Sequence, residues 1–513
     1  MAERSQSLSA QLDTNLSELQ TWFGDTHDLA VRPVRLGEAS QQRAAVAYLF
    51  GTVDQTALAE QVLEPLARAG QFSAVPDGGP IPNMAVIREQ VLSAGISQSV
   101  TEWSELSREM PGGAAALFVD GLAEALLIYL RVELFRSIAE PPTSPVVRGS
   151  REGLIESLDA NLAMVRRRIR SPKLHTAMIT IGDLTRTKVA VLHIRGIADP
   201  AIVAEVMARL RRIRIEGVLE SGYLEEFIQD QSFTLFPTIR NTERVDVVTG
   251  SLMEGRVAII TDGTPFALIV PISFNGLLQV SEDYNQHFPL ATFVRWVRYL
   301  ATTLALTLTG LYVAIVSFNQ EILPFGLALR LAASRLGLPL PTIVEALALE
   351  GAFEILREAG LRMPRAIGQA ISIVGVLVLG EAAVRAGIVD PIMIIVVGAG
   401  ALSSFAIPDY ALVSAFRVTR LGIIILSGTF GLFGLMWGVL FVVTHLLSLK
   451  SFGLAYLSPM APFRPEPLLR DAWSRALWSS NLWRPGFARK RRRQPEKNLP
   501  GVGRPDPEGG NRR

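Results

Sequence analysis

Short apolar runs alternate with helical patterns and polar turns through the first half of the chain, which is typical of α/β structure. Residues 43–54, RAAVAYLFGTVD, combine a basic residue, an apolar strand, a glycine turn and an aspartate, and residues 188–199, KVAVLHIRGIAD, repeat this order. In each copy a helical pattern follows, at 57–67 and at 202–213. The aspartate before each pattern is placed to cap the helix, because its carboxylate accepts hydrogen bonds from the free amides of the first turn.

A second matched pair of motifs follows in the same order. Residues 113–121, GAAALFVDG, resemble residues 255–263, GRVAIITDG, and both strands end in Asp-Gly, which indicates a hairpin because these residues tolerate positive φ. Chance similarity between apolar strands is the alternative, but two pairs in one order favour a duplication. We therefore predict a polar N-terminal segment at 1–27, α/β subdomains at 28–139 and 149–292, and a proline-containing linker at 140–148.

A helix is predicted at 151–170, and it ends in the arginine-rich sequence RRRIR at 166–170. Such a run suits a helix C-terminus that faces water, because the cations complement the negative end of the helix dipole. Nucleic-acid binding is the alternative. No aromatic recognition motif accompanies the arginines, so we expect no nucleic-acid partner.

Beyond residue 292 the pattern changes to long apolar segments, which predict an all-α transmembrane helical bundle at 293–449. A helix needs about 20 apolar residues to cross a hydrocarbon core of about 30 Å. Spans are expected at 299–320, 366–388, 391–408 and 421–449. The charged stretch at 321–365 is expected to be re-entrant or interfacial, with an amphipathic surface helix at 345–362.

Basic residues predict that the partly disordered tail at 450–513 is cytoplasmic. No signal peptide is evident within residues 1–21, so the N-terminal region is also expected in the cytoplasm. Two cytoplasmic ends require an even number of spans. Four spans would place the arginines of 321–365 outside, against the positive-inside tendency, so the number of spans stays open.

Two kinds of residue inside the predicted spans are candidates for function. Glu381 and Arg385 lie four residues apart and can form an ion pair, which either neutralises a helix end or lines a polar path. Small residues allow close helix packing, within one subunit or around a pore, and the candidates are Gly398, Gly400, Gly428, Gly431, Gly434 and Gly438.

The composition of the chain mainly argues against particular kinds of site and activity. The chain has no cysteine and five scattered histidines, so disulfides, thiolate catalysis and a metal site are not expected. Asp262 lacks the adjacent lysine of a phosphorylated aspartate motif, and no phosphate-binding loop ending in Gly-Lys-Ser/Thr occurs. We therefore predict no enzymatic activity and no cofactor.

An ordered set of short motifs extends from about residue 28 to residue 462. They are REGLIESLDAN (151–161), TERVD (242–246), LMEGRVAII (252–260), DGTP (262–265), EDY (282–284), REAGLRMP (357–364), IVG (373–375) and SFG (451–453). Together they resemble the GerA-type A subunits of spore germinant receptors. The resemblance assigns no known role to the motif residues Glu243, Arg244, Asp246, Asp262, Gly263 and Glu358.

The resemblance implies a non-enzymatic receptor subunit that acts in endospore germination. Family A subunits sit in the spore inner membrane with B and C subunits, and the B subunit is thought to sense the nutrient. The A subunit is thought to form a homo-oligomeric ion channel. The expected partners are therefore membrane lipid, B and C subunits, further copies of the chain, and monovalent cations as permeant ions.

Three positions depart from the family pattern: Val245 replaces a proline, Glu381 a glutamine and Asn285 a tyrosine. The change at Glu381 puts a neutral polar role there in doubt. An accessory protein of the stage V sporulation AF type and a secondary transporter remain alternatives. The repeat lies in the soluble part, and the prolines near the predicted spans stand at span ends, which argues against a transporter.

Overall fold

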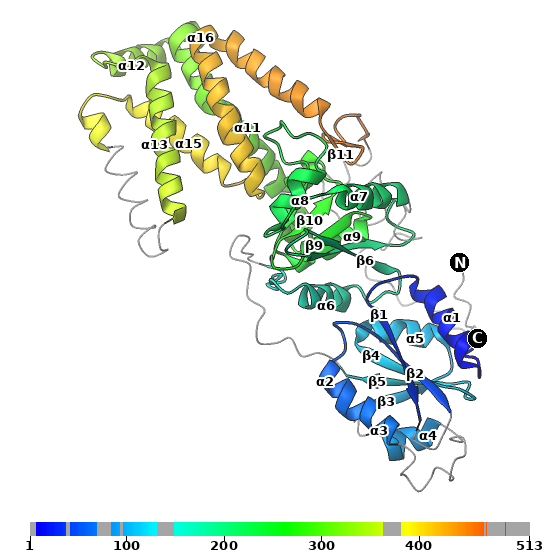
Figure 1. The fold of residues 1–513 in the computed structure, drawn as a ribbon. Coiled ribbons are helices and arrows are strands. Elements are labelled where there is room, and N and C mark those ends of the chain that lie inside the picture. Colours follow the sequence, from blue (N-terminus) through cyan, green and yellow to red (C-terminus); the bar gives the residue numbers. More distant parts are fainter. Residues whose placement is uncertain are drawn as a thin grey trace, which may run out of the picture. The chain divides into compact units, whose positions relative to one another are not determined.

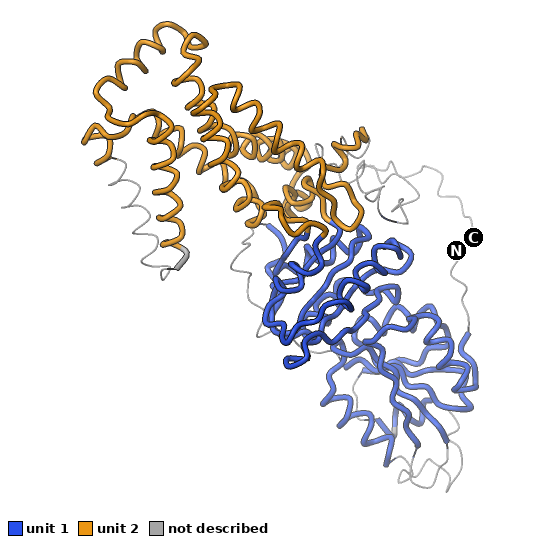
Figure 2. The backbone as a smooth tube through the Cα atoms, turned by 45° about the horizontal axis from the view of Figure 1, so that its top comes forward, with its two compact units in different colours: residues 1–229, 239–271, 481–513 blue, residues 230–238, 272–480 orange. Residues whose placement is uncertain are grey.

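The computed structural model describes residues 7–36, 42–68, 84–92, 96–130, 148–362 and 381–465, together with Leu468 and Ala488. The chain forms two compact units, which are described separately (Figure 2). The sheet unit comprises residues 1–229, 239–271 and 481–513, and the helical unit comprises residues 230–238 and 272–480.

The first half of the sheet unit is an antiparallel sheet with helices on both faces (Figure 1). Its strands lie in the order β1 (Leu29–Arg35), β2 (Arg43–Leu49), β4 (Ala114–Val119), β5 (Ala125–Tyr129) and β3 (Ser97–Val100). Because side chains alternate along a strand, Ala44 and Val46 of β2 belong to one buried cluster, and Ala45 and Ala47 belong to the other.

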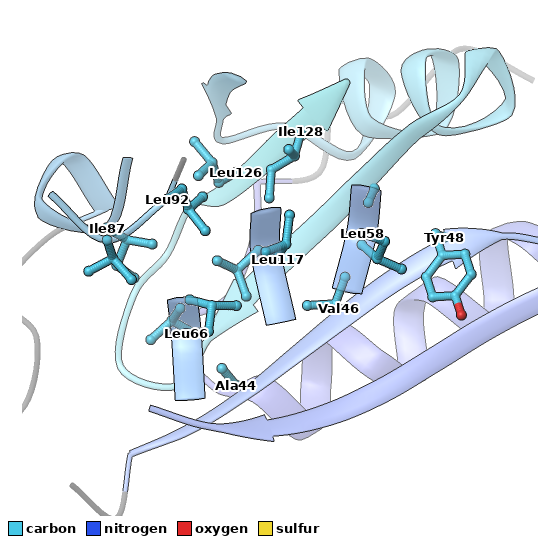
Figure 3. Packing of buried hydrophobic residues seen from close by; sticks show 14 of the residues in the cluster. Ala44, Val46, Tyr48, Leu58, Leu66, Ile87, Leu92, Leu117, Leu126 and Ile128 are labelled. Carbon is cyan, nitrogen blue, oxygen red and sulfur yellow. The ribbon is translucent and has the colours of Figure 1, made fainter. Parts of the chain in front are cut away.

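Different helices cover the two faces of this sheet. On one face, α1 (Leu12–Phe23) and α5 (Trp103–Glu109) contribute Leu19, Phe23 and Trp103 to the core. Figure 3 shows the opposite cluster, where Leu58, Leu66 and Ile87 pack against the strands. The covering helical segments there are α2 (Gln55–Leu58), η1 (Ala59–Leu63), α3 (Glu64–Ala67), α4 (Met84–Val86) and η3 (Ile87–Val91).

The second half repeats this plan. Its strands lie in the order β6 (Leu174–Ile181), β7 (Thr187–Ile194), β9 (Val257–Thr261), β10 (Ala267–Val270) and β8 (Arg240–Thr242), which matches the first sheet strand for strand. Its helices are α6 (Leu158–Arg168), α7 (Pro200–Arg212), α8 (Ser221–Ile228) and α9 (Val245–Glu254). The predicted duplicated α/β region is therefore confirmed, and all pairings among the described strands of both sheets are antiparallel.

Matching hydrogen bonds hold the first helix of each copy. The Asp120 carboxylate accepts from the Leu12 amide at 3.0 Å, and the Asp262 carboxylate accepts from the Leu158 amide at 3.2 Å. Both aspartates precede a glycine with positive φ in the predicted hairpin turn. The Asn15 side chain forms two hydrogen bonds with the Ser9 backbone. In the second copy, Asn161 forms the same two hydrogen bonds with the Ile155 backbone.

The first copy begins earlier than predicted. The boundary placed at residue 28 separates α1 from the sheet on which it packs, whereas Leu12, Leu19 and Phe23 are almost completely buried there. The polarity of residues 1–27 concealed this helix, because only one of its faces is apolar. The predicted caps at Asp54 and Asp199 are confirmed, since both carboxylates accept amide hydrogen bonds from the following helix.

Polar contacts join the two copies within the sheet unit. Arg166 of α6 binds Asp28 through two hydrogen bonds of 2.7 and 2.9 Å, and both side chains are almost wholly buried. Beside this pair, the rings of His175 and His193 face each other across β6 and β7 with centroids 4.9 Å apart. His175 Nε2 also lies 2.8 Å from the backbone oxygen of Asp25.

The helical unit contains α10 (Phe274–Leu277), α11 (Phe288–Phe318), α12 (Phe325–Arg335), α13 (Thr342–Arg362), α15 (Pro391–Ser404) and α16 (Tyr410–Ser448). Short 3-10 turns lie at Ser281–Tyr284 and Gln320–Ile322, and a small ribbon pairs β11 (Lys450–Ser451) with β12 (Leu454–Ala455). By length and composition, α11 and α16 are apolar enough to cross a membrane. The predicted mixed fold, a sheet region followed by a helical region, is confirmed.

Helix α16 is a hairpin and not one straight helix (Figure 1). Gly431 has φ 62° and ψ −143°, which is not helical, and the chain reverses there. A Cβ at Gly438 would lie 3.7 Å from the Cα of Ile423, although 15 helical residues would separate two positions by about 22 Å. The single span predicted at 421–449 is therefore wrong, because a glycine-specific conformation divides it.

The other predicted spans have different outcomes. The segment at 299–320 lies largely within α11, which extends from Phe288 to Phe318. In place of the span at 391–408 stands α15, whose 14 residues reach only about 21 Å. The span at 366–388 falls mostly outside the described residues.

We expect Gly431→Ala to destabilise the helical unit by about 1–3 kcal/mol, because alanine is strained in this backbone conformation. Its Cβ would also lie 2.8 Å from the Cβ of Phe318. Gly422→Ala is the matched control, since no atom lies within 4 Å of the added Cβ. Thermal unfolding of the purified chain in detergent measures both changes, and equal midpoints would contradict the hairpin.

A second prediction concerns the histidine pair of the sheet unit. The pKa of His193 is lowered to about 4, chiefly because burial disfavours the charged ring, and also because His175 and Arg195 lie nearby. An unfolded histidine titrates near about 6.5, so between about pH 6.5 and 4 the unfolded chain binds a proton that the folded chain does not. Stability is therefore complete above this window and is lost as the pH falls through it.

In His193→Gln, the free energy of unfolding should fall by about 1–2 kcal/mol less on acidification than in the unmodified chain. This figure is reduced because the ring is partly exposed to solvent. Urea unfolding at pH 7 and pH 4.5, with hydrogen exchange in β6 and β7 as the probe, measures the difference in the free energy of unfolding between the two pH values. His27→Gln is the control, because the His27 side chain is exposed. An unchanged pH dependence in His193→Gln would contradict the assignment.

Candidate functional site

A buried ion pair joins α13 to the first arm of the α16 hairpin. Glu350 and Arg420 are 2.6 Å apart, with 2% and 5% of their side chains exposed. Thr309 of α11 donates a hydrogen bond of 3.2 Å to the same carboxylate. Three helices thus meet at one carboxylate, and charged groups this deeply buried require such partners.

Further charges extend the pair along the same helices. Glu354, one turn beyond Glu350, forms an ion pair with Arg417 and lies 3.9 Å from Arg357. A cavity of about 360 Å³ opens beside these groups. Its polar lining consists of Glu350, Glu354, Ser414, Arg417 and Arg420, and apolar residues of α13 and α16 complete it.

Arg420 has more donors than the surrounding protein satisfies. Its Nη2 binds Glu350, whereas Nε and Nη1 are buried and have no hydrogen-bond partner among the described residues. Gly400 of α15 lies beside this side chain, since a Cβ there would lie at the ordinary contact distance of 3.5 Å from Nη1. The site therefore combines a cavity, paired charges and unsatisfied guanidinium donors.

A second polar group lies elsewhere on α13. Arg335 of α12 binds Glu345 at 3.2 Å, and Glu345 is completely buried. Tyr312 donates a hydrogen bond of 2.6 Å to Asp390, which caps α15. The helix predicted at 345–362 to be an amphipathic surface helix therefore differs at Glu345 and Glu350, which are buried because arginines of neighbouring helices pair with them, whereas Glu354 and Glu358 are exposed as predicted.

The candidate residues within the predicted spans are not gathered at one place. Glu381 and Arg385 form the predicted ion pair at 2.5 Å, but their side chains are 56% and 78% exposed. Gly398 has no close neighbour, whereas Gly400 lies beside Arg420. The remaining glycines serve packing within the chain: Gly428 against Ile343, Gly431 at the reversal, and Gly434 and Gly438 against the first arm of the hairpin.

The motif residues of the sheet unit have structural surroundings. Arg244 and Asp246 pair at 2.7 Å at the start of α9, and the Glu243 backbone oxygen accepts from the Leu154 amide at 2.6 Å. Asp262 and Gly263 form the turn that holds α6. In the helical unit, the Glu358 side chain is exposed. Within the described ranges, no three His, Asp or Glu residues are placed to hold a metal ion.

Sequence reasoning missed Arg417 and Arg420. Both precede the uncharged segment at 421–449 that was predicted as the last span, and neither was singled out as a candidate. The available signal was their spacing of three residues, which puts them on one face of an otherwise apolar helix at 410–430. A pair of arginines on such a face requires acidic partners, and α13 carries them.

Glu350→Gln or Arg420→Gln alone should destabilise the helical unit by about 3–5 kcal/mol, because each leaves its partner buried and unpaired. The double replacement Glu350→Met with Arg420→Met should recover most of that loss. Glu381→Gln is the control and should change stability by at most about 0.5 kcal/mol, because that pair is exposed. Thermal unfolding in lipid nanodiscs measures all four, and similar midpoints for the single and double variants would contradict the pairing.

Comparisons with known proteins identify relatives over nearly the whole chain. Residues 17–487 match the family model described as Bacillus/Clostridium GerA spore germination protein. The chain is 42% identical to spore germination protein KA of Bacillus subtilis (strain 168) over 94% of this chain and 88% of that protein. It is 38% identical to spore germination protein B1 of the same organism, over 90% of this chain and 94% of that protein.

A solved structure is also similar in sequence. It is the crystal structure of the N-terminal domain of the A subunit of the Bacillus megaterium spore germinant receptor GerK3, which covers 53% of this chain and 99% of that domain at 35% identity and a TM-score of 0.43. The family match and the relatives extend across both units of the chain. The chain therefore belongs to the GerA family of spore germination proteins.

Proposed function

We propose that this protein is the A subunit of a nutrient germinant receptor and acts without catalysis in spore germination. The observation that carries the proposal is the family match over residues 17–487, which includes both the sheet unit and the helical unit. Relatives that match about nine-tenths of the chain are named spore germination proteins. B and C receptor subunits are the corresponding proposed partners.

We place the helical unit in the spore inner membrane, with the sheet unit and the tail on the cytoplasmic side. The length and apolar composition of α11 and the apolar composition of both arms of the α16 hairpin support this placement. Large apolar side chains on their surfaces also support it, including Phe293, Trp296, Phe433, Trp437 and Phe441, each at least half exposed in a single chain. Lipid tails or other subunits would cover such side chains.

Within this placement, we assign a role in ion conduction to the charged residues between α13 and α16. Charges inside an apolar helical bundle are disfavoured unless they serve a polar path or a fixed pair. Glu354 and Arg417 lie at the open part of the cavity, and Glu350 and Arg420 lie deeper. An oligomer that conducts monovalent cations would use such a group to control the path.

The experiment is a current recording from the reconstituted chain with its B and C partners in a planar bilayer under a cation gradient. We expect a gated, cation-carrying current in the presence of nutrient, and a changed conductance or gating in Arg417→Gln. Arg385→Gln is the matched control, because that arginine is exposed and does not line the cavity.

Spores that carry the same variants provide the second readout. Arg417→Gln should slow nutrient germination, and Arg385→Gln should leave it unchanged. Absence of current with all partners and nutrients present would contradict conduction by this subunit. Normal germination of spores that lack the chain, with no other A subunit present, would contradict the receptor role itself.

A further inference from the structure

Helix α12 has three faces of different character. An apolar face consists of Phe325, Leu329 and, directly after the helix, Leu336, whose side chains are 83%, 61% and 83% exposed in a single chain. Because successive helical residues are about 100° apart, these three lie within about 40° of one another around the axis. Leu331, which is buried, lies about 140° from this face in one direction, and the exposed Arg330 lies about 120° from it in the other.

Contacts with α13 fix how α12 is turned about its axis. Arg335, one turn beyond Leu331, pairs with the buried Glu345 at 3.2 Å. Turning the apolar face toward the bundle would break this pair and leave Glu345 buried without its partner, which is strongly destabilising. The face with Leu331 and Arg335 therefore stays against the bundle. The remaining polar face carries Gly326, Arg330 and Ser334, with Leu327 at its edge.

The depth of α12 in the proposed membrane follows from α11. Trp296 near the start of α11 is 58% exposed, and tryptophan is typical of the boundary between hydrocarbon and headgroups. At 1.5 Å per residue, Phe318 at the end of α11 lies about 33 Å from Trp296, which matches a hydrocarbon core of about 30 Å. The exposed polar residues Gln320 and Glu321 follow at once. The chain thus reaches the second boundary directly before α12 begins.

The reversal of α16 marks the same level. The Leu432 amide donates a hydrogen bond of 3.4 Å to the Asn319 side chain, and a Cβ at Gly431 would lie 2.8 Å from that of Phe318. Helix α12 extends from this end of the helical unit (Figure 1). Its 11 residues reach only about 16 Å, which is too short to cross the hydrocarbon core.

From these observations we infer that α12 is an interfacial helix that lies in the lipid boundary opposite the cytoplasm. Phe325, Leu329 and Leu336 enter the acyl chains, and Arg330 stays at the level of the headgroups. A lipid boundary offers apolar and polar surroundings side by side, as the two exposed faces of α12 require. The inference rests on the proposed membrane placement of the helical unit and identifies a surface of that unit that binds lipid.

The test uses the full chain in phosphatidylcholine nanodiscs. Because the chain has no cysteine, a nitroxide label on one introduced cysteine has no background. Collisions of the label with oxygen report lipid, and collisions with a water-soluble nickel complex report water. Labels at Phe325→Cys and Leu329→Cys should collide mainly with oxygen, at about 5–10 Å below the headgroup boundary. Labels at Gly326→Cys and Arg330→Cys should collide mainly with the nickel complex.

A charge on the apolar face should displace the helix from lipid. With the label at Leu336→Cys, Leu329→Asp should increase collisions with the nickel complex several-fold, because a carboxylate is disfavoured among acyl chains. Gly326→Asp is the matched control, since it adds the same charge on the polar face at a glycine with no atom within 4 Å of its added Cβ. It should leave the collisions unchanged.

A label at Phe441→Cys separates this inference from the membrane placement itself. Phe441 is 75% exposed and lies about 15 Å along the second arm of α16 from Gly431. Water contact at Phe441 would contradict the placement on which the inference rests. Oxygen contact at Phe441 with water contact at Leu329 would overturn the inference alone. Shielding of Leu329 from both probes would also overturn it, because protein such as a second copy would then cover the apolar face.

Discussion

The arrangement of the helical unit depends on neutralising charge among apolar helices. Glu350 can be buried in α13 only because Arg420 and Thr309 reach it from α16 and α11. Glu345 is neutralised in the same way by Arg335. Because these buried charges must be paired, the positions of α11, α13 and α16 depend on one another. The cavity between α13 and α16 lies at the same place, because Glu350 and Arg420 are part of its lining.

The sheet unit uses a different principle, the repetition of one folding unit. Each copy holds its first helix with a hairpin aspartate and a buried asparagine, and each sheet has the same strand order. The copies are then tied together by Arg166 and Asp28, which form a buried ion pair. Two copies of one folding unit therefore make up the sheet unit, and buried polar residues help to specify how the copies join.

The sequence was informative where structure depends on local pattern. The glycine and aspartate turns predicted the hairpins and caps, and matched motifs predicted the duplication. Prediction failed where partners are distant in sequence. The acidic residues of α13 suggested a surface helix, because nothing near them in sequence reveals that Arg420 neutralises Glu350. Likewise, Gly431 was read as a packing residue, although its backbone conformation reverses the chain.

The most direct test of this account exchanges the charges of the central pair. Glu350→Arg or Arg420→Glu alone should prevent stable folding of the helical unit, because two like charges would be buried in contact. The double exchange should restore a large part of the thermal stability of the chain in nanodiscs. The same exchange at the exposed pair Glu381 and Arg385 should have little effect in any combination. If the double exchange at 350 and 420 is no more stable than either single reversal, the two residues are not partners, and the arrangement of helices proposed here is contradicted.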